Sequence, residues 1–153
     1  MPPDVRIFLD TSVIFAGPQS ESGGARLILK LGEAGAVVLW IGPMVLREIE
    51  AVVGRKSPAS KTLLALLLDR AQVQVGPEAS AGALDQAQAA IEYLPDAQAV
   101  AEALVTGVDY LVSFDRKHLV DNPQAAQLPF PIGTPADFLA WYRRRLDFSE
   151  GQA

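Results

Sequence analysis

The chain has 153 residues, of which half are apolar, and its 13 Lys and Arg against 18 Asp and Glu give a formal net charge of −5. The apolar content excludes an intrinsically disordered chain, and the absence of Cys excludes a small secreted protein held by disulfides. The negative charge excludes a basic nucleic-acid coat protein. The length predicts a single domain over 1–153, with a core from about 5 to 146 and a short tail at 147–153.

The first part of the chain alternates strand-like and helix-like segments. Residues 5–9 are β-branched and aromatic and predict a strand that ends in the polar loop Asp10-Thr11-Ser12. After a loop rich in Gly, Pro and Ser, a helix is expected from Ser22 to about Glu33. The apolar run 36–41, bounded by glycines, is typical of a strand buried on both faces. Pro43 then begins a helix to about Val53, which Gly54 ends.

The next segments continue the alternation. A helix is expected over 60–71, and its five leucines between 63 and 68 occupy more than one face. It is therefore either deeply buried or part of an oligomer interface. The remaining segments are predicted as a strand at 73–75, helices at 79–91 and from Pro95-Asp96 to about 107, a strand at 109–114, and a marginal strand within 129–135.

The last predicted element is an amphipathic helix from Pro135 to Leu146. Its inward face is expected to hold Phe138, Leu139, Tyr142 and Leu146, with the run 143–145 of three arginines mostly outward. Strands that alternate with helices indicate an α/β fold. We expect three α/β/α layers around a mostly parallel sheet of about five strands.

Carboxylates stand where such a fold places its ligands, beyond the carboxyl ends of the strands. Asp10 and Asp115 each follow a predicted strand, and Asp96 begins a predicted helix. Each also has a structural explanation, as a turn residue or a helix cap. Glu48 and Glu50 lie on opposite flanks of the apolar stripe of their helix, so periodicity does not choose between them. Gathered in one crevice, such acids would repel one another or recruit a hard cation such as Mg²⁺.

Four acidic motifs and a closing junction, in this order from about Ile7 to Phe138, resemble the PIN-domain family of Mg²⁺-dependent nucleases, in particular its toxin-like VapC-type members. The matching segments are Leu9-Asp10-Thr11-Ser12-Val13, Pro43-Met-Val-Leu-Arg-Glu48-Ile49, Asp96-Ala97-Gln-Ala-Val-Ala101-Glu-Ala103, Leu111-Val112-Ser113-Phe114-Asp115-Arg116-Lys117 and Gly133-Thr134-Pro135-Ala-Asp-Phe138. The resemblance favours Glu48 over Glu50. Three residues depart from the family pattern: Ser113 replaces a common Thr, Phe114 replaces Gly or Asn, and Gly42 replaces a frequent Ser.

The resemblance implies a metal-dependent hydrolase that cleaves the phosphodiester bonds of RNA. The acids expected to hold one or two Mg²⁺ or Mn²⁺ ions are Asp10, Glu48, Asp96 and Asp115. The hydroxyls expected to support them or to contact phosphate are those of Thr11, Ser12 and Ser113. The cations nearest to the motifs, and so the candidates for RNA contact, are Arg47, Arg55, Arg116 and Lys117. His118, the only His, is interpreted as a solvated surface residue.

The resemblance also implies partners, because many family members are dimers and many are toxins held in check by a small antitoxin. The N-terminus has no basic segment followed by an apolar stretch, and the longest apolar run, 34–41, is far shorter than a membrane span. We therefore expect a cytoplasmic endoribonuclease with no membrane association. The alternative is a non-catalytic module with the same fold that binds nucleic acid or protein.

Overall fold

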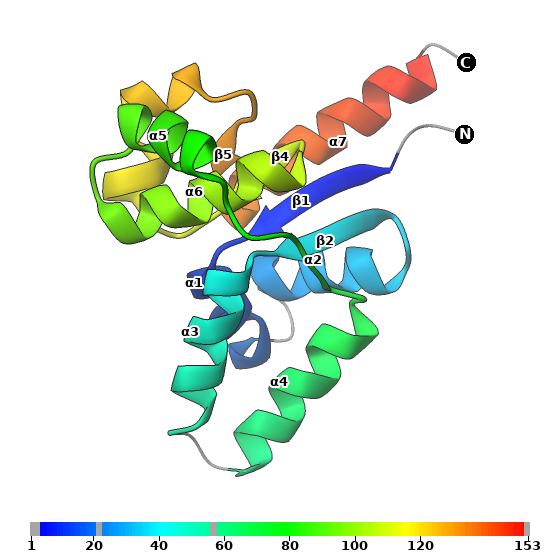
Figure 1. Cartoon of the computed structure of the whole chain (residues 1–153). Helices are drawn as coiled ribbons and strands as arrows, with labels where there is room; N and C mark the ends of the chain where they lie inside the picture. The colour runs from blue at the N-terminus through cyan, green and yellow to red at the C-terminus, as the bar shows by residue number, and fades with distance from the viewer. Residues whose placement is uncertain (1–3, 21–22, 56–57, 152–153) are drawn as a thin grey trace.

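The computed structural model describes residues 4–20, 23–55 and 58–151. Its centre is a sheet of five parallel strands in the order β3-β2-β1-β4-β5 (Figure 1). In chain order the strands are β1 (Val5–Leu9), β2 (Val37–Ile41), β3 (Gln74–Val75), β4 (Tyr110–Val112) and β5 (Ile132–Gly133). The central strand β1 is deeply buried, since Ile7, Phe8 and Leu9 have no exposed surface.

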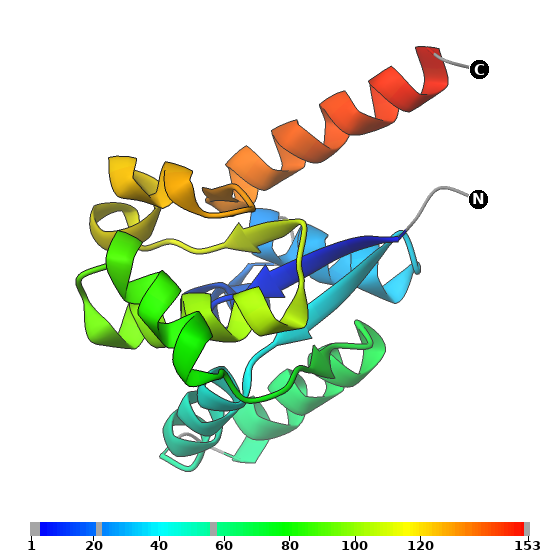
Figure 2. The ribbon, with the colours of Figure 1, turned by 45° about the horizontal axis from the view of Figure 1, so that its top comes forward.

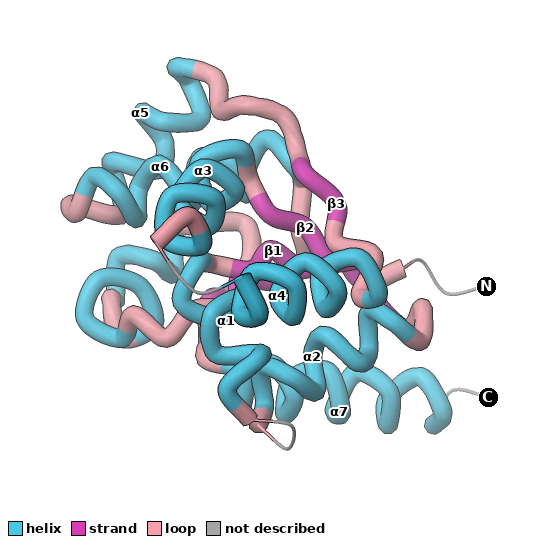
Figure 3. Tube along the Cα trace, turned by 90° about the horizontal axis from the view of Figure 1, so that it is seen from below, coloured by secondary structure: helices cyan, strands magenta, loops and turns pink. Residues whose placement is uncertain are grey.

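Helices cover both faces of this sheet. They are α1 (Thr11–Ala16), α2 (Gly24–Glu33), α3 (Pro43–Val53), α4 (Pro58–Arg70), α5 (Ala81–Ala90), α6 (Leu94–Thr106) and α7 (Pro135–Gly151). Figures 2 and 3 show α2 and α7 on one face and α5 and α6 on the other. The expected three-layer α/β/α architecture with a parallel sheet of five strands is confirmed.

Three short helical turns complete the described part of the chain. They are η1 (Gly17–Gln19), η2 (Arg116–Val120) and η3 (Pro123–Gln127), and η2 has π-helical hydrogen bonding. None of the helices in the described ranges is long and apolar enough to cross a membrane.

Several local expectations differ from the structure. The segment Asp10-Thr11-Ser12 is not a loop, because Asp10 accepts a hydrogen bond from the Thr11 N–H and caps helix α1. Helix α2 begins at Gly24, and the expected cap Ser22 lies outside the described residues. Helix α7 continues to Gly151, and Leu146, which was expected to face inward, is 46% exposed.

The leucine-rich helix α4 is not deeply buried. Leu64 is buried, whereas Leu63 and Leu66 are 42% and 44% exposed. The helix therefore packs one face on the domain and leaves the opposite face open.

Candidate metal centre

The parallel pairing of β1 with β4 places two acids at one edge of the sheet. Leu9 pairs with Val112, and the backbone N–H of Asp10 continues the ladder by donating to the Val112 carbonyl at 3.0 Å. Ser113 is fully buried between the two acids. Its hydroxyl donates to Asp10 Oδ2 at 2.7 Å and accepts the backbone N–H of Asp115 at 3.0 Å. The hydroxyl that replaces the family's Thr therefore joins Asp10 to Asp115.

Helix α3 brings a third acid to this edge. Val45 and Ile49 are buried against the core, so Glu48 is oriented toward α1, where it accepts a hydrogen bond from Thr11 Oγ1. Glu50 lies on the exposed side of the same helix. The structure thus brings Glu48, and not Glu50, to the other acids.

The fourth acid, Asp96, lies in the first turn of α6 and is 8% exposed. It does not cap the helix, since Tyr93 is the N-cap residue. Within the described part of the chain its buried Oδ2 atom accepts no hydrogen bond. A buried carboxylate oxygen without a donor is costly, so this atom points to a missing cationic ligand or a proton.

His118 is not the solvated surface residue that the sequence indicated. It is partly buried, and its Nδ1 atom lies 3.0 Å from Asp115 Oδ2 and 3.4 Å from Asp96 Oδ2. Its ring stacks on that of Tyr93 at 4.5 Å. One possible ligand atom from each of Asp96, Asp115 and His118 lies within 4.8 Å of the others. The signal available in the sequence was the spacing of three residues after Asp115, which the turn η2 closes.

The protonation of the acids reflects burial and mutual repulsion. Burial raises the pKa of Asp10, and the charges of Glu48 and Asp115 add to this, while hydrogen bonds from Ser113 and Thr11 oppose it. Burial, the hydrogen bond with Asp115 and the charges of Asp115, Asp10 and Glu48 raise the pKa of Asp96 to about 8. All four acids therefore interact electrostatically.

The pKa of Asp115 shifts in the opposite direction. Burial would raise its pKa, but the hydrogen bonds it accepts from Asp96 and from His118 outweigh burial and lower its pKa. The contact between the two carboxyls therefore moves their pKa values apart, upward for the more buried Asp96 and downward for Asp115.

These residues fit a divalent cation. Hard cations such as Mg²⁺ and Mn²⁺ take oxygen ligands, and carboxylates are preferred among protein side chains. Asp96 offers a buried oxygen that accepts no hydrogen bond within the described ranges, Asp115 lies beside it, and Asp10 and Glu48 contribute negative charge to the same place. A cation there would relieve the repulsion between these carboxylates.

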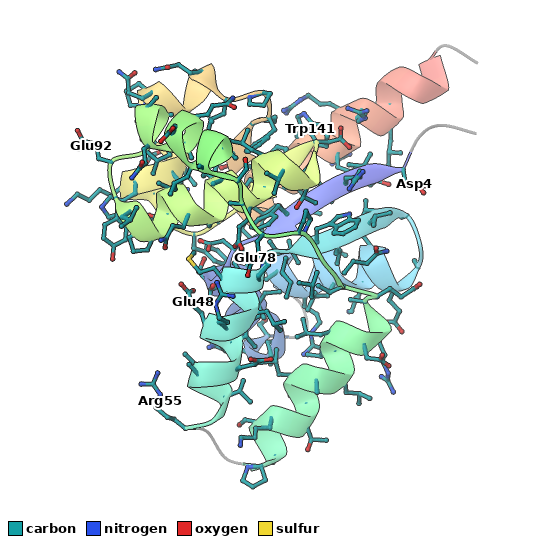
Figure 4. The ribbon with its side chains drawn as sticks, in the orientation of Figure 1. Asp4, Glu48, Arg55, Glu78, Glu92 and Trp141 are labelled. Atoms are coloured by element: carbon teal, nitrogen blue, oxygen red, sulfur yellow. The ribbon has the colours of Figure 1, made fainter. Side chains whose placement is uncertain are left out.

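The other residues that the sequence predicted for the site make the following contacts. Ser12 Oγ accepts the backbone N–H of Phe114 at 3.2 Å. Arg47 is paired with Glu78 at 3.8 Å, and Arg116 with Asp121 at 3.5 Å. Figure 4 shows Arg55 at the far end of α3 from Glu48. Lys117 is exposed and lines the same hollow as His118.

The packing around position 42 explains why glycine stands where the family often has Ser. A Cβ atom at this position would lie 2.5 Å from Cδ and 2.8 Å from Cβ of the buried Glu102. The Glu102 carboxylate accepts the backbone N–H of Met44, at 3.0 Å to Oε2, and so caps the start of α3. Burial raises the pKa of Glu102, against the effect of this hydrogen bond. The polar contact that Ser would supply is therefore provided from α6.

A family model described as the PIN domain matches residues 6–117 of the chain. The chain belongs to the PIN domain family, whose members are generally nucleases that use divalent metal ions.

Two solved structures have similar folds. A chain of VapBC2 from Rickettsia felis, solved bound to a DNA fragment from their promoter, has a TM-score of 0.59 and 16% identity, over 84% of this chain and 97% of that one. PAE2754 from Pyrobaculum aerophilum has a TM-score of 0.54 and 18% identity, over 89% of this chain and 88% of that one. At these identities the likeness concerns the fold alone. No curated protein matches the chain.

Proposed function

We propose that the protein is a metal-dependent endoribonuclease that hydrolyses phosphodiester bonds of RNA. The observation that carries the proposal is the buried Oδ2 atom of Asp96, which accepts no hydrogen bond from the described residues and lies beside Asp115, in electrostatic contact with Asp10 and Glu48. A module that only binds a partner gains nothing from burying mutually repelling carboxylates, because the repulsion lowers its stability.

In this proposal Asp10, Glu48, Asp96 and Asp115 hold one or two Mg²⁺ or Mn²⁺ ions. When bound, such ions neutralise phosphate charge, lower the pKa of water and stabilise a departing oxygen. The chain's own hydroxyls fix the acids: Ser113 holds Asp10 and Thr11 holds Glu48. His118 holds Asp115 through both its backbone N–H and its Nδ1 atom. These contacts keep the carboxylates aligned before substrate arrives.

The test is cleavage of an RNA pool by the purified protein with Mg²⁺ or Mn²⁺, with and without EDTA. Glu48→Gln should reduce the rate at least about 100-fold, as typical for loss of a positioned charged group, whereas Glu50→Gln on the same helix should leave it unchanged. Asp96→Asn should behave like Glu48→Gln. Cleavage that persists in EDTA and in both site variants would refute the proposal.

We further propose that the protein is the toxin of a toxin–antitoxin pair in the cytoplasm and forms a homodimer. The fold it shares with a VapBC2 chain supports this, as does the open leucine face of α4. Expression of the wild type alone should arrest growth, and expression of Asp96→Asn should not. Light scattering of the purified chain would give its oligomeric state. Normal growth with abundant active enzyme would argue against a toxin role.

A further inference from the structure

Two exposed aromatic side chains border the acids. Among the residues whose side chains the structure describes, Tyr93 and Phe114 are the exposed aromatics, at 49% and 47%. Tyr93 is the N-cap of α6, three residues before Asp96, and Phe114 directly precedes Asp115. Large aromatic rings contribute most to stability when buried, so their joint exposure at this one place requires another explanation.

Contacts tie both residues to the site, through the ring of Tyr93 and through the backbone of Phe114. The Tyr93 ring stacks on His118 at 4.5 Å with an angle of 18° between the ring planes, and His118 in turn contacts Asp115. The Phe114 N–H donates to Ser12 Oγ, next to Thr11 and Asp10. Tyr93 therefore borders the Asp96 and Asp115 side of the cluster, and Phe114 borders the Asp10 side.

A hollow of about 530 Å³ adjoins the first of these aromatics, bounded by Tyr93, Lys117, His118 and Asn122 among others. Its volume lies in the usual range for small-ligand sites, about 300–1,000 Å³. Asn122 donates to the carbonyls of Ala90 and His118, which holds the walls together. Lys117 supplies a positive charge for a phosphate, while Glu92, also on the rim, extends outward from the molecule in Figure 4.

We propose that Tyr93, backed by His118, and Phe114 are two base-stacking surfaces on opposite borders of the acid cluster. They would hold the bases on the two sides of the scissile phosphate, and the hollow beside Tyr93 would take the nucleotide next to it. A base must leave its helical stack to lie on an aromatic side chain. This inference rests on the proposed function.

The experiment compares cleavage of one oligoribonucleotide as a single strand and annealed to its complement. The single strand should be cleaved at least about tenfold faster, because loss of stacking on an aromatic has effects of this size or larger. Tyr93→Leu and Phe114→Leu should each reduce kcat/KM on the single strand about tenfold, mostly through KM. Tyr93→Phe keeps the ring and should stay within about twofold of wild type. Leu146→Ala, a similarly exposed residue on α7, is the control.

A second measurement separates stacking from a merely structural role. Once the cleaved bond is mapped, an abasic nucleotide is placed on each side of it in turn. For one of the two abasic substrates, the kcat/KM of the wild type should fall by about the same factor as Tyr93→Leu causes on the intact strand. On that abasic substrate, Tyr93→Leu should cause no further decrease. If Tyr93 only supported His118, the two losses would multiply, and the shift in Tm caused by Mn²⁺ would fall in the variant.

The outcomes distinguish the two proposals. The proposed stacking surfaces are refuted, and the proposed ribonuclease activity stands, if the wild type cleaves the duplex as fast as the single strand. The same conclusion follows if Tyr93→Leu and Phe114→Leu both cleave the single strand as fast as the wild type does. If the wild type leaves every RNA intact with Mg²⁺ and Mn²⁺, the ribonuclease is refuted and the stacking surfaces with it.

Discussion

Asp96 combines burial, an oxygen that accepts no hydrogen bond in the described part of the chain and three neighbouring carboxylates, so it destabilises the metal-free protein. Asp96→Asn keeps the shape of the side chain and removes one charge. We expect a higher Tm in EDTA above pH 8, by about 2–4 °C for each kcal/mol of repulsion relieved. Added Mg²⁺ should raise the Tm of the wild type and leave that of the variant unchanged. Calorimetry of both proteins, with and without Mg²⁺, measures this, and equal Mg²⁺ shifts would contradict it.

The raised pKa of Asp96 also predicts how stability depends on pH. In the unfolded chain this carboxyl loses its proton near its ordinary pKa of 3.8, whereas in the folded metal-free protein it keeps the proton to about pH 8. Between these values the folded state binds more protons, so the free energy of unfolding should fall as pH rises. Urea unfolding in EDTA from pH 5 to 8.5 tests this. Asp96→Asn should show a shallower decline, and an equal decline would contradict the assignment.

At the scale of single residues, the sequence predicted which carboxylates lie close together, because the geometry of parallel strands is regular. Acids that follow adjacent parallel strands must lie at one edge of the sheet, as Asp10 and Asp115 do. The choice of Glu48 over Glu50 required the family resemblance, because helical periodicity alone treats the two alike. His118 was not predicted, because its spacing of three residues after Asp115 is a weak signal unless the π-helical turn that brings the two together is known.

At the scale of elements, the start of α3 is capped by a side chain from another helix. Glu102 on α6 fills the space beside Gly42 and accepts the Met44 N–H. Gly42→Ser would normally improve a helix cap, yet here we expect it to destabilise the protein by about 1–3 kcal/mol through overpacking. Urea unfolding followed by circular dichroism measures the change.

The matched control for this prediction is the double variant. Glu102→Ala alone should lose about 1 kcal/mol, as for other removed caps. Combined with Gly42→Ser, it opens space for the new hydroxyl, so the combined loss of stability should be smaller than the sum of the two single losses. Strict additivity would show that the introduced serine side chain and Glu102 do not compete for the same space.

The elements themselves were predictable where their patterns are distinct. The strand at 5–9 agrees with β1 because an apolar run marks it, and the helix from Pro43 to Val53 agrees with α3 because Gly42 and Gly54 flank its apolar stripe. Helix α1 was missed because six residues are too few to show periodicity, and Asp-Thr-Ser is equally good turn chemistry. Leu146 was misplaced because α7 extends past the sheet in Figure 1, so its later turns have no layer to pack on.

At the scale of the whole molecule, a net charge of −5 opposes RNA binding. Part of this charge is the acid cluster, which a divalent cation would neutralise in part. We therefore expect the wild type to bind a fluorescent RNA oligonucleotide with a cleavage-resistant backbone at least about tenfold more tightly with Mg²⁺ than in EDTA, at equal ionic strength. Fluorescence anisotropy measures this, and spermidine in EDTA controls for general charge screening. Equal affinity in Mg²⁺ and EDTA would contradict the charge argument.

The pairing of β1 with β4 joins residues that lie more than a hundred positions apart in the chain, as the bond from Ser113 to Asp10 shows. During synthesis, a nascent chain that ends before β4 can contain Asp10 and Glu48 but has neither Ser113 nor Asp115. Such a chain cannot assemble the acid cluster. On the proposed function, the growing chain therefore cannot cut RNA until about three quarters of the sequence has been translated, and fragments that end before Asp115 are inactive.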